Sequence, residues 1–230
     1  MKQTWQTDDM SSGVVPLRSP RTPHLVGSGM PTSGGSRERI DWAELAGRHV
    51  ILEEKIDGSE VSFHFDADAR LVCRERSAET DMLARGGRQR HLDRLKDWLL
   101  FNEDRLFDRM GGTYLVYAEW CAVAHRIFYD RLPSFLIECD VQDKRTGEFL
   151  STERRIWLLS GLGLAHAPVL FRGTATKDIH PDRLVGRSAF CSGSPPVEQV
   201  GDTSSLDLSG MMEGVYGKVE ENGRVVSRFK

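Results

Sequence analysis

The sequence lacks long apolar runs, is poor in cysteine and shows no excess of positive charge. No run approaches the roughly 20 apolar residues that cross a bilayer, which excludes a membrane-spanning helix. The N-terminal residues contain no apolar signal-peptide segment. The four cysteines, Cys73, Cys121, Cys139 and Cys191, include no Cys-x-x-Cys pair. This spacing disfavours a zinc site or a disulfide framework, and it predicts a protein of the reducing cytoplasm.

The charge balance by itself gives no sign of a nucleic-acid partner. Lysine and arginine number 31 against 34 acidic residues, so the net charge is −3, whereas a basic balance is typical of nucleic-acid binders. A polyanion would therefore need a local basic patch. The candidate patch consists of Arg85, Arg88, Arg90 and Arg94. The alternative is that these side chains belong to a solvated helix face and its connecting loop.

With 230 residues, 39% hydrophobic and 28% charged, the chain is long enough for one sizeable core. Residues 1–38 are rich in Gly, Ser, Pro and Thr and predict an irregular leader with an ordered arm near residues 20–25. Residues 39–230 form the predicted globular domain. Apolar alternation predicts strands at residues 50–55, 61–65, 71–75, 114–120, 134–141, 213–220 and 224–230. Helices are predicted around residues 92–106 and over 152–160, with Ser151 as N-cap of the second. The fold class is α+β with mainly antiparallel strands.

Lys55 is the candidate nucleophile. It lies at the end of a predicted strand, directly after Glu53 and Glu54, and it opens a Lys-x-Asp-Gly sequence. A lysine amine attacks phosphorus only in its neutral form, and a free lysine with a pKa of about 10.4 is mostly charged near neutral pH. Nearby cations and burial both favour the neutral form. Taken alone, however, the tetrapeptide fits an exposed strand-end lysine before a turn.

Further charged residues lie in the predicted strands. Glu119 interrupts an otherwise apolar strand, which is costly unless its side chain faces a polar site. Glu213 and Lys218 lie on one strand, and Arg228 and Lys230 lie on the next. Carboxylates together with lysine and arginine suit a triphosphate and a hard divalent cation. A surface salt bridge is the alternative for any one of these residues alone.

Taken together and in this order, these segments resemble motifs I, III, IIIa, IV and V of the covalent nucleotidyltransferase superfamily, which contains ATP-dependent DNA ligases, RNA ligases and messenger-RNA capping enzymes. The matching segments are residues 55–58, 117–120, 135–143, 213–218 and 228–230. The sequence is most similar to the RNA ligase branch, whose members share an arm like residues 20–25 and a stretch like residues 125–133. The resemblance covers roughly residue 20 to the end. It implies the ligase adenylation fold, in which antiparallel sheets flank a nucleotide cleft and helices lie at the periphery.

The resemblance also implies roles for individual residues. Lys55 would carry the AMP. Glu53 would read the adenine amino group, and Arg76, or Arg74 in an alternative register, would contact the ribose. Glu119 would hold the ribose hydroxyls and is a second candidate for the metal.

Motifs IV and V supply the remaining implied roles. Glu213 would organise Mg²⁺ or Mn²⁺ through water. Lys218 and Lys230 would grip phosphate oxygens, with Lys230 at the α-phosphate. The other implied nucleotide-binding residues are Glu54, Ile56, Asp57, Gly58, Phe135, Cys139 and Arg228.

Two positions depart from the family pattern. Ala118 replaces the motif III glycine, which is a mild change. Cys139 stands where an aromatic residue stacks on adenine in the family. Because base stacking is worth about 1–3 kcal/mol, we expect weaker nucleotide binding. Phe135 is a candidate substitute.

The C-terminal hairpin poses a conflict of register. A two-residue Asn-Gly turn at residues 222–223 predicts that Val215 pairs with Lys230. Cross-strand partners share a face, so Lys230 would join Glu213 while Lys218 points away. All three reach one site only if a bulge or strong twist redirects Lys218. We therefore predict such an irregularity.

The predicted function is an ATP-dependent RNA ligase that uses Mg²⁺ or Mn²⁺, forms a lysyl-AMP intermediate and joins an RNA 5′-phosphate to a 3′-OH. A DNA ligase or a capping-type guanylyltransferase is the alternative enzyme. Since motif V lies at the end of the sequence, no OB domain is expected in this chain, which favours RNA. A nucleotide- or nucleic-acid-binding module that has lost catalysis is the alternative of another class. No membrane partner is expected.

Overall fold

The computed structural model describes residues 22–28, 38–76, 78–192 and 205–230. Its N-terminal strands are β1 (His24–Leu25), β2 (Arg39–Ile40), β3 (His49–Glu54), β4 (Ser59–Phe65), β5 (Leu71–Glu75) and β6 (Ala78–Thr80). The later strands are β7 (Tyr114–Trp120), β8 (Leu136–Asp143), β9 (Phe149–Leu150), β10 (Ala165–His166), β11 (Val169–Thr174), β12 (Val215–Glu221) and β13 (Arg224–Phe229). The α-helices are α1 (Asp93–Phe101), α2 (Glu103–Met110) and α3 (Thr152–Leu159). Short 3₁₀ helices are η1 (Trp42–Leu45), η2 (Gly87–Leu92) and η3 (Pro181–Leu184).

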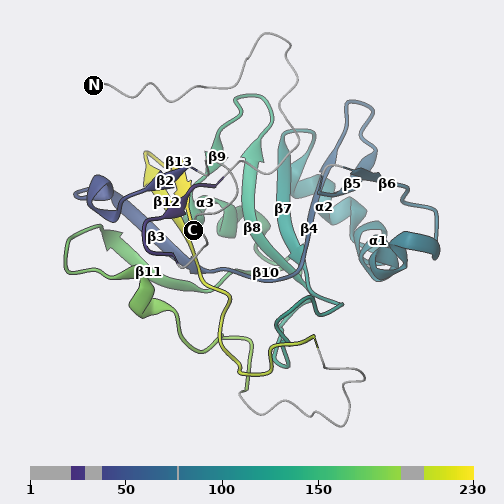
Figure 1. Cartoon of the computed structure of the whole chain (residues 1–230). Helices are drawn as coiled ribbons and strands as arrows, with labels where there is room; N and C mark the ends of the chain where they lie inside the picture. Colours follow the sequence, from purple (N-terminus) through teal and green to yellow (C-terminus); the bar gives the residue numbers. More distant parts are fainter. Residues whose placement is uncertain (1–21, 29–37, 77, 193–204) are drawn as a thin grey trace.

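The strands form one continuous hydrogen-bonded path in the order β11-β3-β12-β13-β9-β8-β7-β4-β5-β6, with β10 beside β8. All pairs along the path are antiparallel, whereas β10 joins β8 in parallel. Figure 1 shows β3, β11, β12 and β13 on one side, β4, β7 and β8 on the other, and α3 between the two groups. Helices α1 and α2 lie beyond β4 (Figure 1). The chain crosses from one group to the other between β3 and β4, at residues 55–58.

Each strand group has its own apolar core. Phe63 and Phe65 of β4 pack with Leu95 and Leu99 of α1 in the larger core, as their periodicity predicts. Val50, Leu52, Val219 and Phe229 form the core of the β3 and β12 side. Val50 and Leu52 occupy one face of β3, so the alternate residues of that strand face the other group. No described helix is long and apolar enough to cross a bilayer.

The β12–β13 hairpin contains the predicted irregularity. The pairing shifts by one residue between Val219 and Glu220, so the regular register, with Val215 opposite Lys230, does not form. Arg228 thus lies opposite Lys218. The shift brings these two cations to one face, which a regular ladder would not do.

Close packing fixes the shifted register. Gly217 lies opposite Phe229, and a Cβ at this glycine would lie 2.1 Å from the Phe229 ring. The aromatic ring therefore fills the space that a side chain on β12 would need.

The described part of the predicted arm contacts the C-terminus. Strand β1 pairs with β2; the Leu25 amide donates to the Lys230 carbonyl at 2.8 Å, and the Lys230 amide donates to the Pro23 carbonyl at 3.0 Å. Residues 20 and 21 of the arm, like the rest of the leader up to residue 21, lie outside the described residues. Ser151 occupies the N-cap position of α3, but its side chain makes no capping hydrogen bond. Instead the Thr152 amide donates to Glu220 Oε1 at 2.6 Å.

Candidate functional site

Lys55 and Glu213 meet at the point where β3 ends. The Lys55 backbone amide donates to the Gly214 carbonyl at 3.0 Å, which holds the lysine beside the residue before β12. Its Nζ donates to the Glu213 carboxylate, and the two side chains are 30% and 31% exposed. Two residues separated by 158 positions are thus joined at a site that stays open to solvent. An amine so placed is accessible to a small molecule.

Glu119 lies close enough to this pair to share its electrostatics. It stands opposite Glu60 in the β4–β7 ladder, and its Oε2 is buried without a hydrogen-bond partner among the described residues. Burial raises the pKa of Glu119 to about 8; Lys55 opposes the shift, and the charges of Glu60, Glu213 and Asp57 add to it. A carboxylate in this position is poised to accept a cation.

The glycine of the lysine motif is required by close packing. A Cβ at Gly58 would lie 2.9 Å from Cys121 Sγ and 3.0 Å from the Trp120 carbonyl. Gly58 therefore lets the crossing segment pass directly against the end of β7. Ile56 is buried in an apolar cluster with Ile137, so it packs rather than facing a ligand.

Glu54 and Asp57, on either side of this segment, hold loops. Glu54 accepts hydrogen bonds from the Ser188 hydroxyl and from the Ala189 amide, the latter at 3.0 Å. Asp57 Oδ2 accepts the amides of residues 126 and 127 at 2.8 and 2.9 Å, and the Asp57 amide donates to the Tyr129 hydroxyl at 2.9 Å. Both carboxylates, which we expected near the nucleotide, are occupied by these loop contacts.

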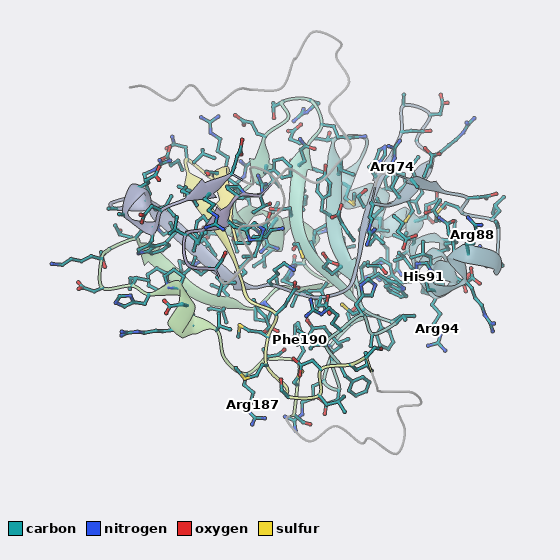
Figure 2. The ribbon with its side chains drawn as sticks, viewed as in Figure 1. Arg74, Arg88, His91, Arg94, Arg187 and Phe190 are labelled. Carbon is teal, nitrogen blue, oxygen red and sulfur yellow. The ribbon has the colours of Figure 1, made fainter. Side chains whose placement is uncertain are left out.

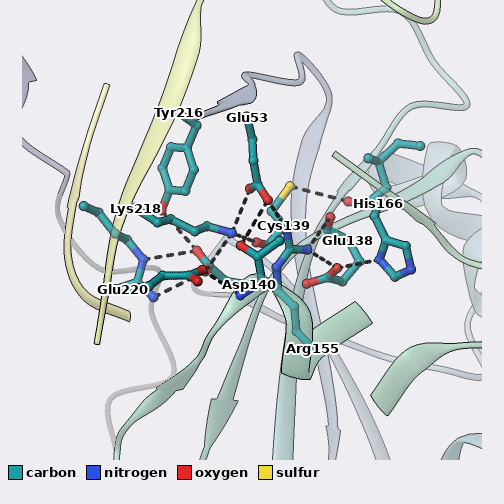
Figure 3. Close-up of polar contacts among 12 residues, drawn as sticks. Glu53, Glu138, Cys139, Asp140, Arg155, His166, Tyr216, Lys218 and Glu220 are labelled. Atoms are coloured by element: carbon teal, nitrogen blue, oxygen red, sulfur yellow. Dashed lines mark hydrogen bonds and ion pairs between the residues drawn. The ribbon is translucent and has the colours of Figure 1, made fainter. Parts of the chain in front are cut away.

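A buried ion network joins the two strand groups (Figure 3). Arg155 of α3 pairs with Glu53 of β3 and with Glu138 of β8, and all three side chains are fully buried. Lys218 Nζ lies 2.8 Å from Glu53 Oε2, and His166 Nδ1 lies 2.9 Å from Glu138 Oε2. Although burial opposes its charge, the carboxylates of Glu138 and Glu53 raise the pKa of Arg155. Glu53, expected to read adenine, has its carboxylate engaged by Arg155 and Lys218.

Asp140 extends the network toward β13. Its carboxylate lies 3.3 Å from Lys218 Nζ and 3.2 Å from Arg228 Nε, and it accepts the Tyr216 hydroxyl at 3.1 Å. Burial opposes its charge, but Arg228 and Lys218 hold the pKa of Asp140 far below its usual range. Lys218 and Arg228, both expected to bind the nucleotide, are therefore close together. They lie in a buried network and pair with carboxylates of the chain itself.

Cys139 is the extra residue of a bulge. Tyr117 pairs with Asp140 and the next residue, Ala118, pairs with Glu138, so Cys139 has no cross-strand partner in β7. Its carbonyl accepts a hydrogen bond from Lys218 Nζ. Burial raises the pKa of the thiol well above its ordinary value. Glu138 and Asp140, on either side of the bulge, both belong to the network.

Arg76, Arg74 and Phe135, expected at the ribose and the base, form no hydrogen bond or ion pair with the Lys55–Glu213 pair or with the buried network within the described part of the chain. Arg76 is exposed and has a left-handed backbone, whereas the alternative, Arg74, pairs with Glu79 at 3.3 Å. Phe135 is 47% exposed, and its ring meets Trp120 edge-on with centroids 6.1 Å apart.

One of the four arginines of the predicted basic patch forms an ion pair within the described part of the chain. Arg85 pairs with Asp97 at 2.7 Å. Arg88, Arg90 and Arg94 are exposed and have no ion pair within the part of the chain that the structure describes. Figure 2 shows Arg88 and Arg94 on the α1 side of the molecule.

Sequence reasoning missed Arg155, Glu138 and His166. Glu138 carried the same signal as Glu119, an acid within an apolar strand. Arg155 falls on the buried face of α3 together with Leu158 and Leu159, and a cation at such a position indicates a buried partner. No group of three or more His, Cys, Asp or Glu residues is arranged to hold a metal among the described residues.

The chain is similar to a known protein family and, in its fold, to solved structures. A family model described as RNA ligase matches residues 48–230, and curated protein sequences show no match. A solved mutant of Naegleria gruberi RNA ligase with ATP and Mn is similar, with a TM-score of 0.58 and 15% identity, covering 94% of this chain and 56% of that one. A second mutant of that ligase, with AMP and Mn, has a TM-score of 0.53 at 14% identity and coverages of 94% and 61%.

The same ligase with PPi has a TM-score of 0.54 at 14% identity and coverages of 91% and 60%. The chain thus spans less than two thirds of the length of these solved structures. At this identity the likeness concerns the fold, and it confirms the predicted α+β architecture built on antiparallel strands.

Proposed function

The chain belongs to the RNA ligase family, and from this we propose that it carries AMP from ATP on Lys55, transfers it to an RNA 5′-phosphate and seals that end to a 3′-OH. The observation that carries the proposal is the position of Lys55 Nζ against Glu213, beside the buried carboxylate of Glu119. The ion partner of Lys55 is the Glu213 carboxylate, not the cations that we expected to favour the neutral amine. An accessible amine beside a carboxylate that can take up its proton, at the crossing between two strand groups, suits nucleotidyl transfer.

The chemistry follows from this placement. The neutral Lys55 amine attacks the α-phosphorus of ATP, a phosphorus–nitrogen bond forms, and the bond to the β-phosphate oxygen breaks to release pyrophosphate. The Glu213 carboxylate, in contact with Nζ, is placed to accept the proton that the amine loses. An RNA 5′-phosphate oxygen then displaces the lysine from phosphorus, and a 3′-OH finally displaces AMP. The solved relatives with ATP or AMP and Mn support this nucleotide.

Glu119 and Glu213 fit a divalent cation. Burial raises the pKa of Glu119, and its buried Oε2 has no hydrogen-bond partner among the described residues, so a bound cation would stabilise its charged form. Mg²⁺ keeps several of its waters and takes only one or two carboxylates, which agrees with the absence of a three-ligand cluster among the described residues. When bound, Mg²⁺ or Mn²⁺ neutralises charge on the phosphate oxygens. The two glutamates would hold the ion through water.

Covalent labelling tests the proposal. The purified chain is incubated with α-labelled ATP or GTP and Mg²⁺ or Mn²⁺, and protein-bound label is measured after denaturation. We expect labelling by ATP, its loss in Lys55→Ala and Lys55→Arg, and release of the label by pyrophosphate. Lys177→Ala, which removes an exposed lysine, is the matched control and keeps the label.

Absence of label from the folded wild-type chain with either nucleotide would refute the proposal. Label from GTP alone would indicate a capping-type enzyme. Sealing of nicked all-RNA, all-DNA and hybrid duplexes by the labelled protein then identifies the acceptor, and sealing of DNA alone would contradict the assignment to RNA.

A further inference from the structure

Two loops are anchored to the residues that flank Lys55. The Asp57 carboxylate holds the amides of Arg126 and Ile127, within the loop between β7 and β8. The Glu54 carboxylate holds Ser188 and Ala189, in the segment after η3. A carboxylate that accepts two hydrogen bonds from one loop holds that loop in a defined position. Both loops are therefore positioned by residues at the end of β3 and just beyond it, on either side of the candidate nucleophile.

The two loops are also joined to each other. The Arg131 amide donates to the Phe190 carbonyl at 3.0 Å, and Asp130 accepts the Ser192 amide at 2.7 Å. The rings of Tyr129 and Phe190 meet edge-on with centroids 6.3 Å apart. These contacts make one connected surface of residues 125–131 and 187–192, beside Lys55.

This surface carries three exposed arginines, Arg126, Arg131 and Arg187, which we call the arginine rim. None of the three guanidinium groups forms an ion pair within the described part of the chain. Figure 2 shows Arg187 at the edge of the molecule, on the outer side of Phe190. The anchoring bonds described above use backbone atoms of Arg126 and Arg131. Asp207 and Asp130 interact electrostatically with Arg126 and Arg131, but neither forms an ion pair with them, so the guanidinium groups can bind a ligand.

Electrostatics indicate what this ligand is. The chain is acidic overall, with a net charge of −3, and Glu60, Glu119 and Glu213 surround the Lys55 end of the site. A polynucleotide end that approaches Lys55 would meet these carboxylates, so local cations must offset the repulsion. Arginine suits phosphate because its planar fork binds two oxygens at once.

We propose that the arginine rim binds backbone phosphates of the RNA next to the ends that are joined. This inference rests on the proposed function, since the RNA acceptor of that reaction would bring its backbone phosphates beside Lys55. Glu54 and Asp57 anchor the two loops by hydrogen bonds. In this way they fix the position of the arginine rim relative to Lys55, and their carboxylates do not contact the nucleotide. The rim is a binding surface separate from the predicted patch near α1.

The salt dependence of RNA affinity tests the rim. Affinity for a nicked RNA duplex is measured over a salt series for the wild-type chain and for the triple variant Arg126→Gln, Arg131→Gln, Arg187→Gln. Each lost phosphate contact reduces the slope of log affinity against log salt by about 0.9, so three reduce it by about 2.7. Between about 50 and 200 mM salt the wild-type affinity should therefore fall about 40-fold more than that of the variant.

The triple variant Arg88→Gln, Arg90→Gln, Arg94→Gln removes the same charge from another surface and is the matched comparison. An equal or larger loss of slope in that variant, or an unchanged slope in the rim variant, overturns the proposal. Single rim substitutions, each expected to lower the slope by about 0.9, serve if the triple variant does not fold.

Labelling of the wild-type chain by ATP, on the same preparation, reports on the proposed function alone. If the chain is labelled by ATP but the salt dependence of its RNA affinity is unchanged in the rim variant, only the proposal of the arginine rim is refuted. A chain that binds RNA through the rim but never labels refutes the ligase assignment.

Discussion

Replacement of Arg155 by methionine tests the buried network that joins the two strand groups. The change removes the cation shared by Glu53 and Glu138 while it keeps much of the side-chain volume. Breaking a fully buried pair costs about 3–5 kcal/mol, because the remaining carboxylate stays buried without its counter-charge. Lys218 still faces Glu53, and His166 still faces Glu138. We therefore expect a loss near the lower end, about 3 kcal/mol.

The free energy of unfolding is measured by urea titration, with thermal unfolding in parallel. For a chain of about this size a loss of 1 kcal/mol lowers Tm by about 2–4 °C, so Arg155→Met should lower Tm by about 6–12 °C. Arg154→Met is the matched control on the same helix, because Arg154 is exposed and its one hydrogen bond among the described residues goes to the Gly223 carbonyl. Its expected effect is within about 0.5 kcal/mol.

A compensating variant separates charge from packing. Arg155→Met combined with Glu138→Gln removes one of the two stranded carboxylates and should recover part of the lost stability. If Arg155→Met is as stable as Arg154→Met, the network does not hold the strand groups together. If the compensated variant is no better than the single one, the loss comes from packing and the electrostatic reasoning is refuted.

Two further predictions concern single residues near the site. Because the folded state raises the pKa of Glu119 from 4.5 to about 8 through burial, the folded chain holds a proton that the unfolded chain releases, so this residue makes stability fall as pH rises between those values. Glu119→Gln should thus gain on the order of 3 kcal/mol relative to wild type between about pH 5 and pH 8 in urea unfolding; a constant difference would contradict the shift. Gly217→Ala forces a methyl group into the Phe229 ring and should cost about 1–3 kcal/mol, whereas Gly214→Ala, with open space around it, should be tolerated; equal stability of the two variants would refute the packing argument.

Many of the strands were predictable, because the alternation of apolar and polar residues along the chain indicates them. The strands predicted at residues 71–75 and 114–120 coincide with β5 and β7, since apolar alternation follows from the two-residue repeat of a strand. The position of Lys55 at a strand end also came from the pattern of apolar residues before it. Register was harder, because one extra residue moves every following side chain to the opposite face.

The roles of the acids could not be assigned by this reasoning. Glu54 and Asp57 flank Lys55 in sequence, yet their carboxylates hold loops more than 65 positions away. Glu53 was expected at the nucleotide, and it pairs with an arginine 102 positions distant. A carboxylate in a motif has the same local signature whether its partner is a ligand or a distant backbone amide.

The sequence by itself determined the α+β class and the order of the motif segments, because these depend on neighbours along the chain. The candidate nucleophile followed from the resemblance of the ordered segments to a known family, not from its own tetrapeptide. Only the tertiary structure decided which charges meet. Arg155 from α3, Lys218 from β12 and Asp140 from β8 share one buried network, although no spacing links them. Buried charges must find partners to offset the loss of water, and which partners lie within reach is set by bulges and packing that distant segments create together.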